Sequence, residues 1–184
     1  MHLIVGLGNP GEKYLKSRHN AGFMILRSMI GDEWTSESRE KSLIHHETLM
    51  DRELLYAMPQ TFMNNSGLAV KTLQKKHGVS PENIFVIHDD IDLPFGSWKL
   101  QFARGAGGHN GVQSVIDQIG TNEFVRIKVG IAPVNTEGKA IKPKPGIFQS
   151  QKAAVAKYVM KDFSKRDQER LKVIAKEIRE AIET

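Results

Sequence analysis

Apolar and polar residues follow two different periods along the chain, and each period predicts one kind of element. Short apolar runs bounded by glycine, proline or acidic residues predict strands. These runs cover residues 2–8, 42–49, 52–59, 83–87, 96–105 and 124–132. Apolar residues at helical spacing, preceded by cap-type residues or followed by glycine, predict helices. These helices are expected over residues 19–30, 64–78 and 111–120 and from residue 165 onwards.

The order of these elements predicts an α/β fold. Strands that alternate with helices favour a mixed, mostly parallel twisted sheet flanked by helices, which is a three-layer sandwich. Residues 42–49 and 52–59 are separated by only Met50 and Asp51, so we expect them to pair antiparallel. A chain of 184 residues is most simply one domain, and we expect a single domain over residues 1–184.

The last predicted helix and the segment before it differ in character. The helix carries an apolar stripe that is expected to pack on the sheet. The stripe consists of Leu171, Ile174, Ala175, Ile178 and Ile182. Residues 133–152 contain proline, glycine and four lysines without an apolar period, which predicts a long loop or lid.

Composition narrows the class of protein. With 40% apolar and 26% charged residues, the chain resembles an ordinary globular domain. It has no apolar run of about 18 residues and no basic-then-apolar leader, so we expect a cytoplasmic protein. The absence of cysteine excludes disulfides, thiolate metal ligands and a cysteine nucleophile. A net charge of +5 and a pI near 9.4 suit a phosphate-rich partner.

A glycine-rich segment directly after the first strand raises the possibility of nucleotide binding. Residues 6–11, GLGNPG, match the G-x-G-x-x-G pattern that holds a pyrophosphate at a helix N-terminus. The next predicted helix begins only near residue 19, too far along the chain to meet such a phosphate. The acidic residues Asp32 and Glu33 follow a helix, whereas the pattern requires one after a second strand. A structural turn that presents Asn9 is the better interpretation.

Polar residues gather, in the expected fold, at one rim of the sheet. The carboxyl ends of parallel strands meet at one edge of an open α/β sheet, and ligands bind there. Asn9 follows the first strand, and residues 88–92, HDDID, come just past the end of a second. His19 opens the first helix, whereas Asn64 and Asn110 stand near the starts of two others, where backbone N–H groups attract negative charge.

These residue types suit hydrolysis by water. A histidine has a pKa near neutrality and can take a proton from an attacking water. An aspartate hydrogen-bonded to the other ring nitrogen fixes the tautomer and stabilises the imidazolium. Asparagine amides can donate to a developing oxyanion without adding charge. No GxSxG segment is present, so direct attack by water is favoured over a serine acyl-enzyme.

Each candidate also has a plainer interpretation. The histidine and asparagines at helix starts are suitable caps, and His109, beside glycines, suits a structural loop. Four residues of HDDID could instead bind a divalent metal ion. They are His88, Asp89, Asp90 and Asp92. In a continuing strand, however, successive side chains point in different directions. The basic charge alone also fits an RNA-binding protein without catalysis.

Four blocks occur in a fixed order along the chain. They are VGLGNPGEKYLKSRHNAGF, PQTFMNNSG, HDDIDLPFGSWKL and GAGGHNG, which span residues 5–111, and KYVMKDFS follows at 157–164. Together they resemble bacterial peptidyl-tRNA hydrolases. The resemblance implies a monomeric α/β enzyme that needs no metal ion and no cofactor. Its expected reaction is hydrolysis of the ester that joins a peptide to the 3′ acceptor end of tRNA.

The resemblance also implies roles for individual residues. His19 matches the general base, and Asp89 matches the carboxylate that keeps the base able to accept a proton. Asn9 matches the residue that helps to distinguish a peptidyl group from a free aminoacyl group. His109 is then expected to support the structure. Four residues match positions that line the substrate channel, namely Tyr14, Phe62, Asn64 and Asn110.

Three departures from the family pattern stand out. Ser17 occupies a position where threonine is commoner, which is a mild change. The segment KLQFARGA, before GGHNG, carries fewer lysines than the family often has there. The candidates for contacts to tRNA phosphates are therefore Arg104, Arg126 and Lys128. Residues 133–152 are longer and richer in lysine than the resemblance predicts. They fit an altered lid, an added tRNA contact or a disordered loop.

Overall fold

The computed structural model describes residues 1–146 and 149–183, and in them it contains one seven-stranded sheet with the strand order β2-β3-β4-β1-β5-β7-β6. The strands are β1 His2–Gly6, β2 Thr35–Glu37, β3 Ser42–Leu49, β4 Arg52–Pro59, β5 Ile84–Pro94, β6 Trp98–Phe102 and β7 Val125–Ala132. The α-helices are α1 Ala21–Ile30, α2 Ser66–His77, α3 Asn110–Ile119, α4 Gln151–Val159 and α5 Lys165–Glu183. Short 3-10 helices are η1 Glu12–Tyr14, η2 Arg18–Asn20, η3 Met63–Asn65 and η4 Pro81–Asn83.

The sheet is mixed, as predicted. The central strands β4, β1, β5 and β7 are mutually parallel, whereas β2, β3 and β6 join at the edges by antiparallel pairing. Residues 42–49 and 52–59 form the expected antiparallel pair, β3 and β4. Parallel central strands place their carboxyl ends on the same side, and this arrangement creates the rim on which the polar residues gather.

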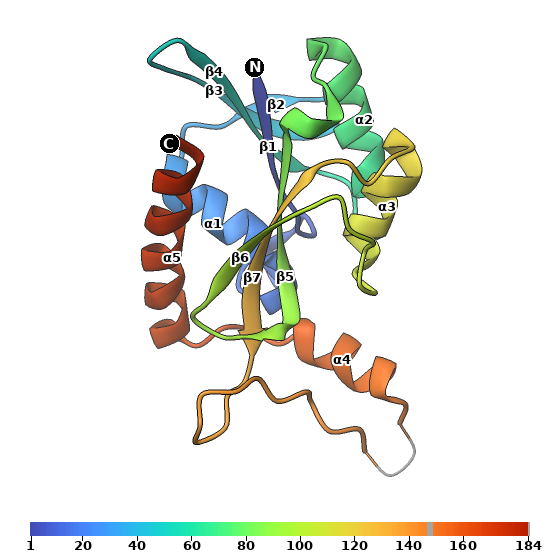
Figure 1. The fold of residues 1–184 in the computed structure, drawn as a ribbon, viewed down its shortest axis with the longest axis vertical. Helices are drawn as coiled ribbons and strands as arrows, with labels where there is room; N and C mark the ends of the chain where they lie inside the picture. Colours follow the sequence, from blue (N-terminus) through green and yellow to red (C-terminus); the bar gives the residue numbers. More distant parts are fainter. Residues whose placement is uncertain (147–148, 184) are drawn as a thin grey trace.

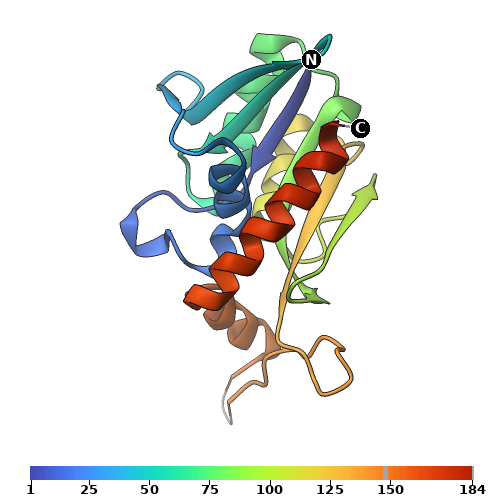
Figure 2. The same ribbon diagram turned by 90° about the vertical axis from the view of Figure 1, so that its left-hand side faces the viewer.

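Helices cover both faces of the sheet and give the predicted three layers (Figures 1 and 2). α1 and α5 pack on one face, where Ile4 of β1 joins Phe23 and Ile178 in one buried cluster. α2 and α3 pack on the other face, where Leu3 joins Val70 in a second cluster. The apolar stripe predicted on the last helix is buried along its whole length. In the described part of the chain, no helix combines the length and the apolar character needed to cross a membrane.

Two parts of the chain differ from expectation. β5 runs to Pro94, so HDDID lies inside the strand instead of just past its end, because β5 goes on pairing with β7 through Asp90 and again at Pro94. The predicted loop 133–152 is also shorter. Residues 133–146, 149 and 150 form neither helix nor strand, residues 147 and 148 lie outside the described part, and α4 already begins at Gln151. The loop and α4 project beyond the end of the sheet (Figure 1).

Candidate active site

His19 is held in η2, immediately before α1, and close packing of α1 on β1 sets its position. A Cβ on Gly6 would lie 2.6 Å from the carbonyl oxygen of Gly22, so only glycine allows this approach. A Cβ on Gly8 would likewise lie 2.6 Å from the ring of Phe23, so Gly6 and Gly8 of GLGNPG serve strand–helix packing. Their loop leads into the three-residue helix η1, which is too short to hold a pyrophosphate as a dinucleotide-binding helix does.

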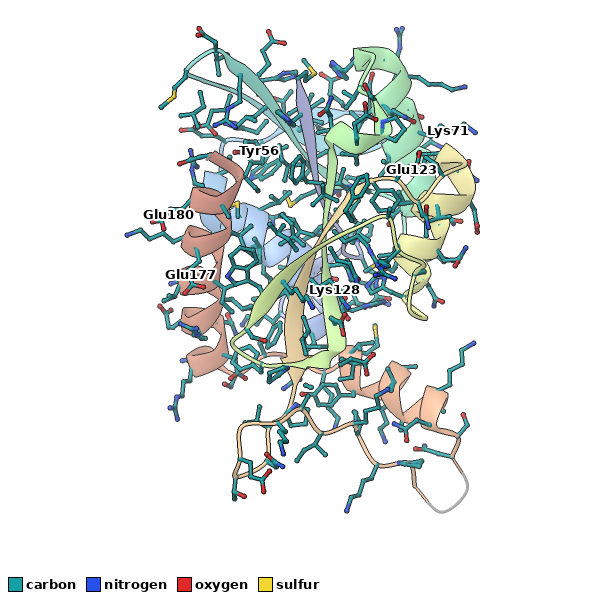
Figure 3. The ribbon with its side chains drawn as sticks, viewed as in Figure 1. Tyr56, Lys71, Glu123, Lys128, Glu177 and Glu180 are labelled. Atoms are coloured by element: carbon teal, nitrogen blue, oxygen red, sulfur yellow. The ribbon has the colours of Figure 1, made fainter. Side chains whose placement is uncertain are left out.

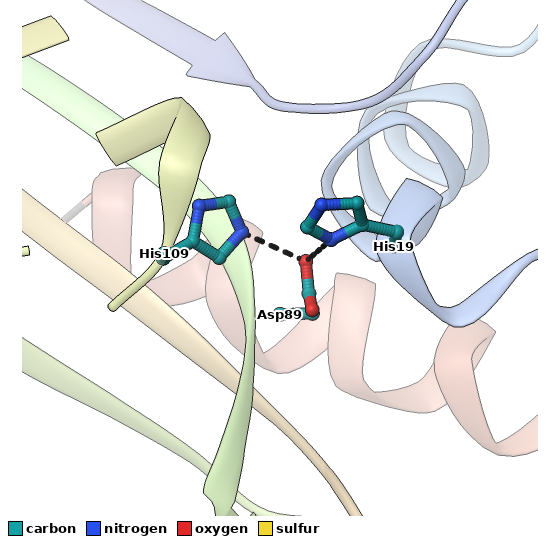
Figure 4. A group of neighbouring side chains, drawn as sticks. All are labelled: His19, Asp89 and His109. Carbon is teal, nitrogen blue, oxygen red and sulfur yellow. Dashed lines mark hydrogen bonds and ion pairs between the residues drawn. The ribbon is translucent and has the colours of Figure 1, made fainter. Parts of the chain in front are cut away.

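His19 and Asp89 are in direct contact, although 70 residues separate them in the sequence. The Nδ1 atom of His19 lies 2.9 Å from Oδ1 of Asp89 (Figure 4). The side chain of Asp89 is 4% exposed, and that of His19 is 14% exposed. A buried carboxylate accepts hydrogen bonds, so Nδ1 carries the proton and Nε2 is the nitrogen left to accept one.

His109 binds the same carboxylate oxygen from the other side. Its Nε2 atom lies 2.9 Å from Oδ1 of Asp89. Its Nδ1 atom accepts a hydrogen bond from the backbone N–H of Val112 at 3.3 Å and so caps α3. That bond places the proton on Nε2, and His109 therefore donates to Asp89. The side chain connects the start of α3 to the carboxylate, whereas the sequence had predicted only a structural role for His109.

Burial and charge have opposite effects on the pKa values of His19 and Asp89. Burial alone would lower the pKa of His19, but the charge and the hydrogen bond of Asp89 outweigh it, and the pKa is raised above its usual value. Burial opposes the charged form of Asp89, yet the two histidines hold the pKa of that carboxyl far below its usual range. The carboxylate therefore stays ionised and favours a proton on His19.

His88 is buried beside His109. Its Nδ1–H donates to the backbone carbonyl of Asp89 at 2.8 Å, and its ring lies edge-on to His109 at 4.7 Å. Complete burial and the neighbouring His109 lower its pKa well below the usual value. His88 is therefore a neutral residue that packs against the ring of His109.

Asn9 is fixed by a pair of backbone contacts. Asn20 accepts from the N–H of Asn9 and donates to its carbonyl oxygen, both at 2.9 Å. The side-chain Oδ1 of Asn9 accepts from the N–H of Met63 at 2.8 Å, which ties the loop after β1 to η3. The remaining polar group of Asn9 is its side-chain NH₂, a donor. Asn20 stands at the N-cap of α1, but its side chain makes no cap hydrogen bond and instead holds the backbone of Asn9.

Two of the four residues predicted to line the substrate channel contact each other, and the other two are exposed at helix starts. Tyr14 and Phe62 approach each other edge-to-face, with ring centroids 6.5 Å apart, and Phe62 is 56% exposed. Asn64 lies in η3 and Asn110 begins α3, as expected, and both are exposed. Among the described residues no hydrogen bond joins either amide to His19 or Asp89, so their substrate contacts remain predictions.

The acidic segment of β5 does not form the alternative metal site. Asp90 pairs with Lys128, and Asp92 pairs with Lys142 on the loop at 2.7 Å. In the described residues the one group with metal-binding spacing is His19, Asp89 and His109, whose ligand atoms lie within 4.8 Å of one another. A metal ion on Nε2 of His109 would displace the proton held there. The neutral ring would then carry its proton on Nδ1, which could no longer accept from the N–H of Val112 and cap α3.

The three candidates for contacts to tRNA phosphates differ in how accessible their side chains are. The prediction for Arg126 is wrong: its side chain is buried, 3% exposed, and donates to Gln101 at 2.7 Å across the paired strands β6 and β7. Lys128, labelled on β7 in Figure 3, is engaged by Asp90 and mostly buried. Arg104 is exposed in the loop before α3, and its contact with phosphate stays a prediction.

A histidine that a buried aspartate holds by one ring nitrogen, at the rim of an α/β sheet, is an arrangement typical of hydrolases. The family model described as peptidyl-tRNA hydrolase matches residues 3–184. Over 182 residues the chain is 38% identical to the peptidyl-tRNA hydrolase of Aquifex aeolicus, with 98% of this chain and 85% of that protein covered. It is 41% identical to that of Aliarcobacter butzleri over 184 residues, covering 100% and 91%.

A solved structure agrees with the sequence relatives. The crystal structure of peptidyl-tRNA hydrolase from Acinetobacter baumannii superimposes with a TM-score of 0.78 at 27% identity, covering 96% of this chain and 83% of that one. The chain belongs to the peptidyl-tRNA hydrolase family. The family and the fold expected from the four sequence blocks are thereby confirmed.

Proposed function

We propose that this protein hydrolyses peptidyl-tRNA to free peptide and tRNA, with His19 as the general base. The observation that carries the proposal is the 2.9 Å contact between His19 Nδ1 and Asp89 Oδ1 in a chain of this family. It leaves Nε2 as the proton acceptor. Water loses a proton to Nε2 as its oxygen attacks the ester carbonyl, and Asp89 stabilises the imidazolium. The imidazolium then returns the proton to the ribose oxygen as the carbon–oxygen bond of the ester breaks.

Asn9 is proposed to select the substrate by its free NH₂ group. An N-blocked residue presents a carbonyl oxygen, which accepts a hydrogen bond from that group, whereas a free aminoacyl group presents an ammonium, which only donates. The contacts from Asn20 and to Met63 hold the amide in this orientation. The position also suits donation to the oxyanion that forms on the ester carbonyl. We propose further that the enzyme acts as a monomer in the cytoplasm without a metal ion.

The test of this function compares deacylation of N-acetyl-aminoacyl-tRNA with that of the unblocked aminoacyl-tRNA. The protein is expected to release the N-acetylated residue much faster, in the presence of a chelator in excess of trace transition metals. Asn9→Ala is expected to reduce the ratio of the two kcat/KM values by about tenfold, the value of one hydrogen bond. A protein that cleaves neither ester lacks the function, and an unchanged ratio in Asn9→Ala removes Asn9 from selection.

His109 is proposed to set the strength of the base by sharing Asp89. Because the pKa of His19 is raised, protonated and inactive His19 persists above a pH of about 6.5, and the rate falls as the pH decreases through that region. His109→Ala removes one donor from Asp89, so the carboxylate acts more fully on His19. The acid limb of kcat/KM is expected to move up by about half to one pH unit.

The matched variant for this prediction is His109→Gln, whose side-chain NH₂ reaches the position of Nε2. It is expected to return the acid limb toward the wild-type value, whereas a role confined to capping α3 would not produce this reversal. An acid limb at the same pH in wild type and His109→Ala, whatever the change in rate, would contradict the proposal.

A further inference from the structure

His19 lies in η2, a single turn of 3-10 helix that gives the ring little support of its own. η2 has only three residues, and the side chain of its N-cap residue, Ser17, makes no cap hydrogen bond. A turn this short is not stable by itself, because forming it fixes the backbone for very few hydrogen bonds. Close packing of α1 on β1 fixes the chain after His19. The chain before His19 therefore depends on other contacts.

The chain before the catalytic histidine is joined to the segment that follows α4. The N–H of Arg18 donates to the carbonyl of Lys161 at 3.0 Å, and the N–H of Phe163 donates to the carbonyl of Lys16 at 2.8 Å. Between these two bonds lies an isolated antiparallel bridge of one residue from each stretch. Arg18 and Lys161 are 143 positions apart in the sequence, so the two stretches meet only in the folded chain.

The side chain of Arg18 strengthens this link. Its Nη1 atom donates to the backbone carbonyl oxygens of Lys161 at 3.0 Å and of Asp162 at 2.7 Å. The guanidinium also lies over two aromatic rings, 4.7 Å from the centre of Tyr158 and 5.3 Å from that of Phe163. A guanidinium over the face of an aromatic ring is attracted to it. Arg18 thus holds the segment after α4 by hydrogen bonds and by ring contacts together.

Both rings under the guanidinium are themselves anchored. Phe163 is 3% exposed, belongs to the buried cluster of α1 and α5, and has its ring centroid 5.6 Å from that of Phe95. The hydroxyl of Tyr158 donates to the backbone carbonyl of Ile131 in β7 at 2.9 Å. Arg18 therefore connects η2 to groups that are held by the core and by the sheet.

We propose that Arg18 is a positioning residue for the hydrolysis, which fixes η2 so that the ring of His19 meets Asp89. The inference rests on the proposed function, in which His19 is the general base. Asp89 is buried in the central strand β5 and cannot follow a displaced ring. A displacement of about 1 Å can lower the rate of a reaction about 10²-fold. Arg18 thus acts on the reaction through His19 and needs no contact with the substrate.

A positioning role and a role through charge change the pKa of His19 in opposite directions. The titratable groups that face its ring from other elements are Asp89 on β5 and His109 before α3. Burial lowers the pKa of His19 but Asp89 raises it more, so a ring that leaves Asp89 has a lower pKa. Loss of the positive charge of Arg18 alone would instead raise the pKa of His19.

The test is Arg18→Ala, measured by the pH dependence of kcat/KM for N-acetyl-aminoacyl-tRNA and by an NMR titration of His19. We expect kcat to fall about ten- to hundredfold with KM within about twofold, because a displaced base affects the attack of water and not the binding of substrate. The acid limb and the NMR pKa are both expected at lower pH than in the wild type. Arg18→Lys keeps a donor for the carbonyl oxygens, and both readouts are expected to lie between those of Arg18→Ala and the wild type.

Arg27→Ala is the matched control, because it removes the same charge from α1, where the side chain is exposed. It is expected to keep the wild-type kcat and acid limb. The proposal is overturned if the acid limb of Arg18→Ala stays in place or moves to higher pH, if its kcat is unchanged, or if Arg27→Ala changes in the same way. If circular dichroism shows that Arg18→Ala does not fold, Arg18→Lys decides by the same criteria.

The NMR titration separates this inference from the proposed function, because it needs no activity. Wild-type protein that cleaves neither the N-blocked nor the free aminoacyl ester would overturn the proposed function. Equal pKa values of His19 in the wild type and in folded Arg18→Ala would overturn the positioning role, whatever the activity.

Discussion

His19→Ala is expected to lower kcat for N-acetyl-aminoacyl-tRNA by about 10²- to 10⁴-fold, the range that a general base contributes. His19 alone combines a neutral Nε2 with a carboxylate behind the ring, and His109 cannot replace it because its own Nε2–H donates to Asp89. KM is expected to change little, since the ring acts on water. The measurement is the single-turnover release of the N-acetylated residue.

The control for His19→Ala is the same change at His46, which is exposed on β3 and remote from Asp89 in the fold. That variant is expected to keep the wild-type rate. The His19→Ala protein should keep the fold, because the ring is a partly exposed side chain outside the two apolar clusters. Turnover of His19→Ala near that of the wild type would remove His19 from its role.

Asp89→Asn is expected to lower kcat by about 10³- to 10⁴-fold. The same change in a serine protease triad has an effect of this size, because the histidine ring then carries its proton on the wrong nitrogen. An amide that turns its NH₂ toward Nδ1 of His19 stabilises the wrong tautomer and places the proton on Nε2. The variant also loses the negative charge that raises the pKa of His19. The acid limb of its residual activity is therefore expected at lower pH than in the wild type.

Asp92→Asn is the matched control for this prediction. It lies on the same strand, is 57% exposed and pairs with Lys142, and an exposed ion pair contributes about 1 kcal/mol or less to stability. We expect wild-type kcat and an unchanged acid limb. Equal losses in the two variants, or an acid limb of Asp89→Asn that moves to higher pH, would contradict the role given to Asp89.

The fold followed from the sequence because its signals are local. The strand runs, the helical stripe from Leu171 to Ile182 and the glycine after α2 each depend on residues within one element. α4 was missed because its apolar period is weak, with only Ala154 and Val159 buried. The end of β5 was placed too early because the acidic residues resemble a strand end, whereas pairing with β7 continues the strand.

The site was predictable in composition but only partly in geometry. His19 and Asn9 follow from residue type and place along the chain, whereas the resemblance to the family singled out Asp89 within HDDID. The structure joins His19 to Asp89 and Asn9 to Asn20, the neighbour of His19 in η2. The tautomer of His109 depends on the N–H of Val112, and no periodic pattern encodes that bond. The burial of Arg126 depends on the register of β6 against β7, which local sequence does not specify.

The central claim is that His19 takes the proton from water through Nε2 and that Asp89 holds Nδ1. The most direct measurement is an NMR titration of the His19 ring nitrogens, compared with the acid limb of kcat/KM for N-acetyl-aminoacyl-tRNA in the same buffer. In the neutral ring, Nε2 is expected to carry no proton. The pKa from the NMR titration and the pKa from the acid limb of kcat/KM are expected to agree, and to lie above the ordinary histidine value. A neutral ring protonated on Nε2, or a ring that titrates at a pH different from the kinetic limb, would contradict the account.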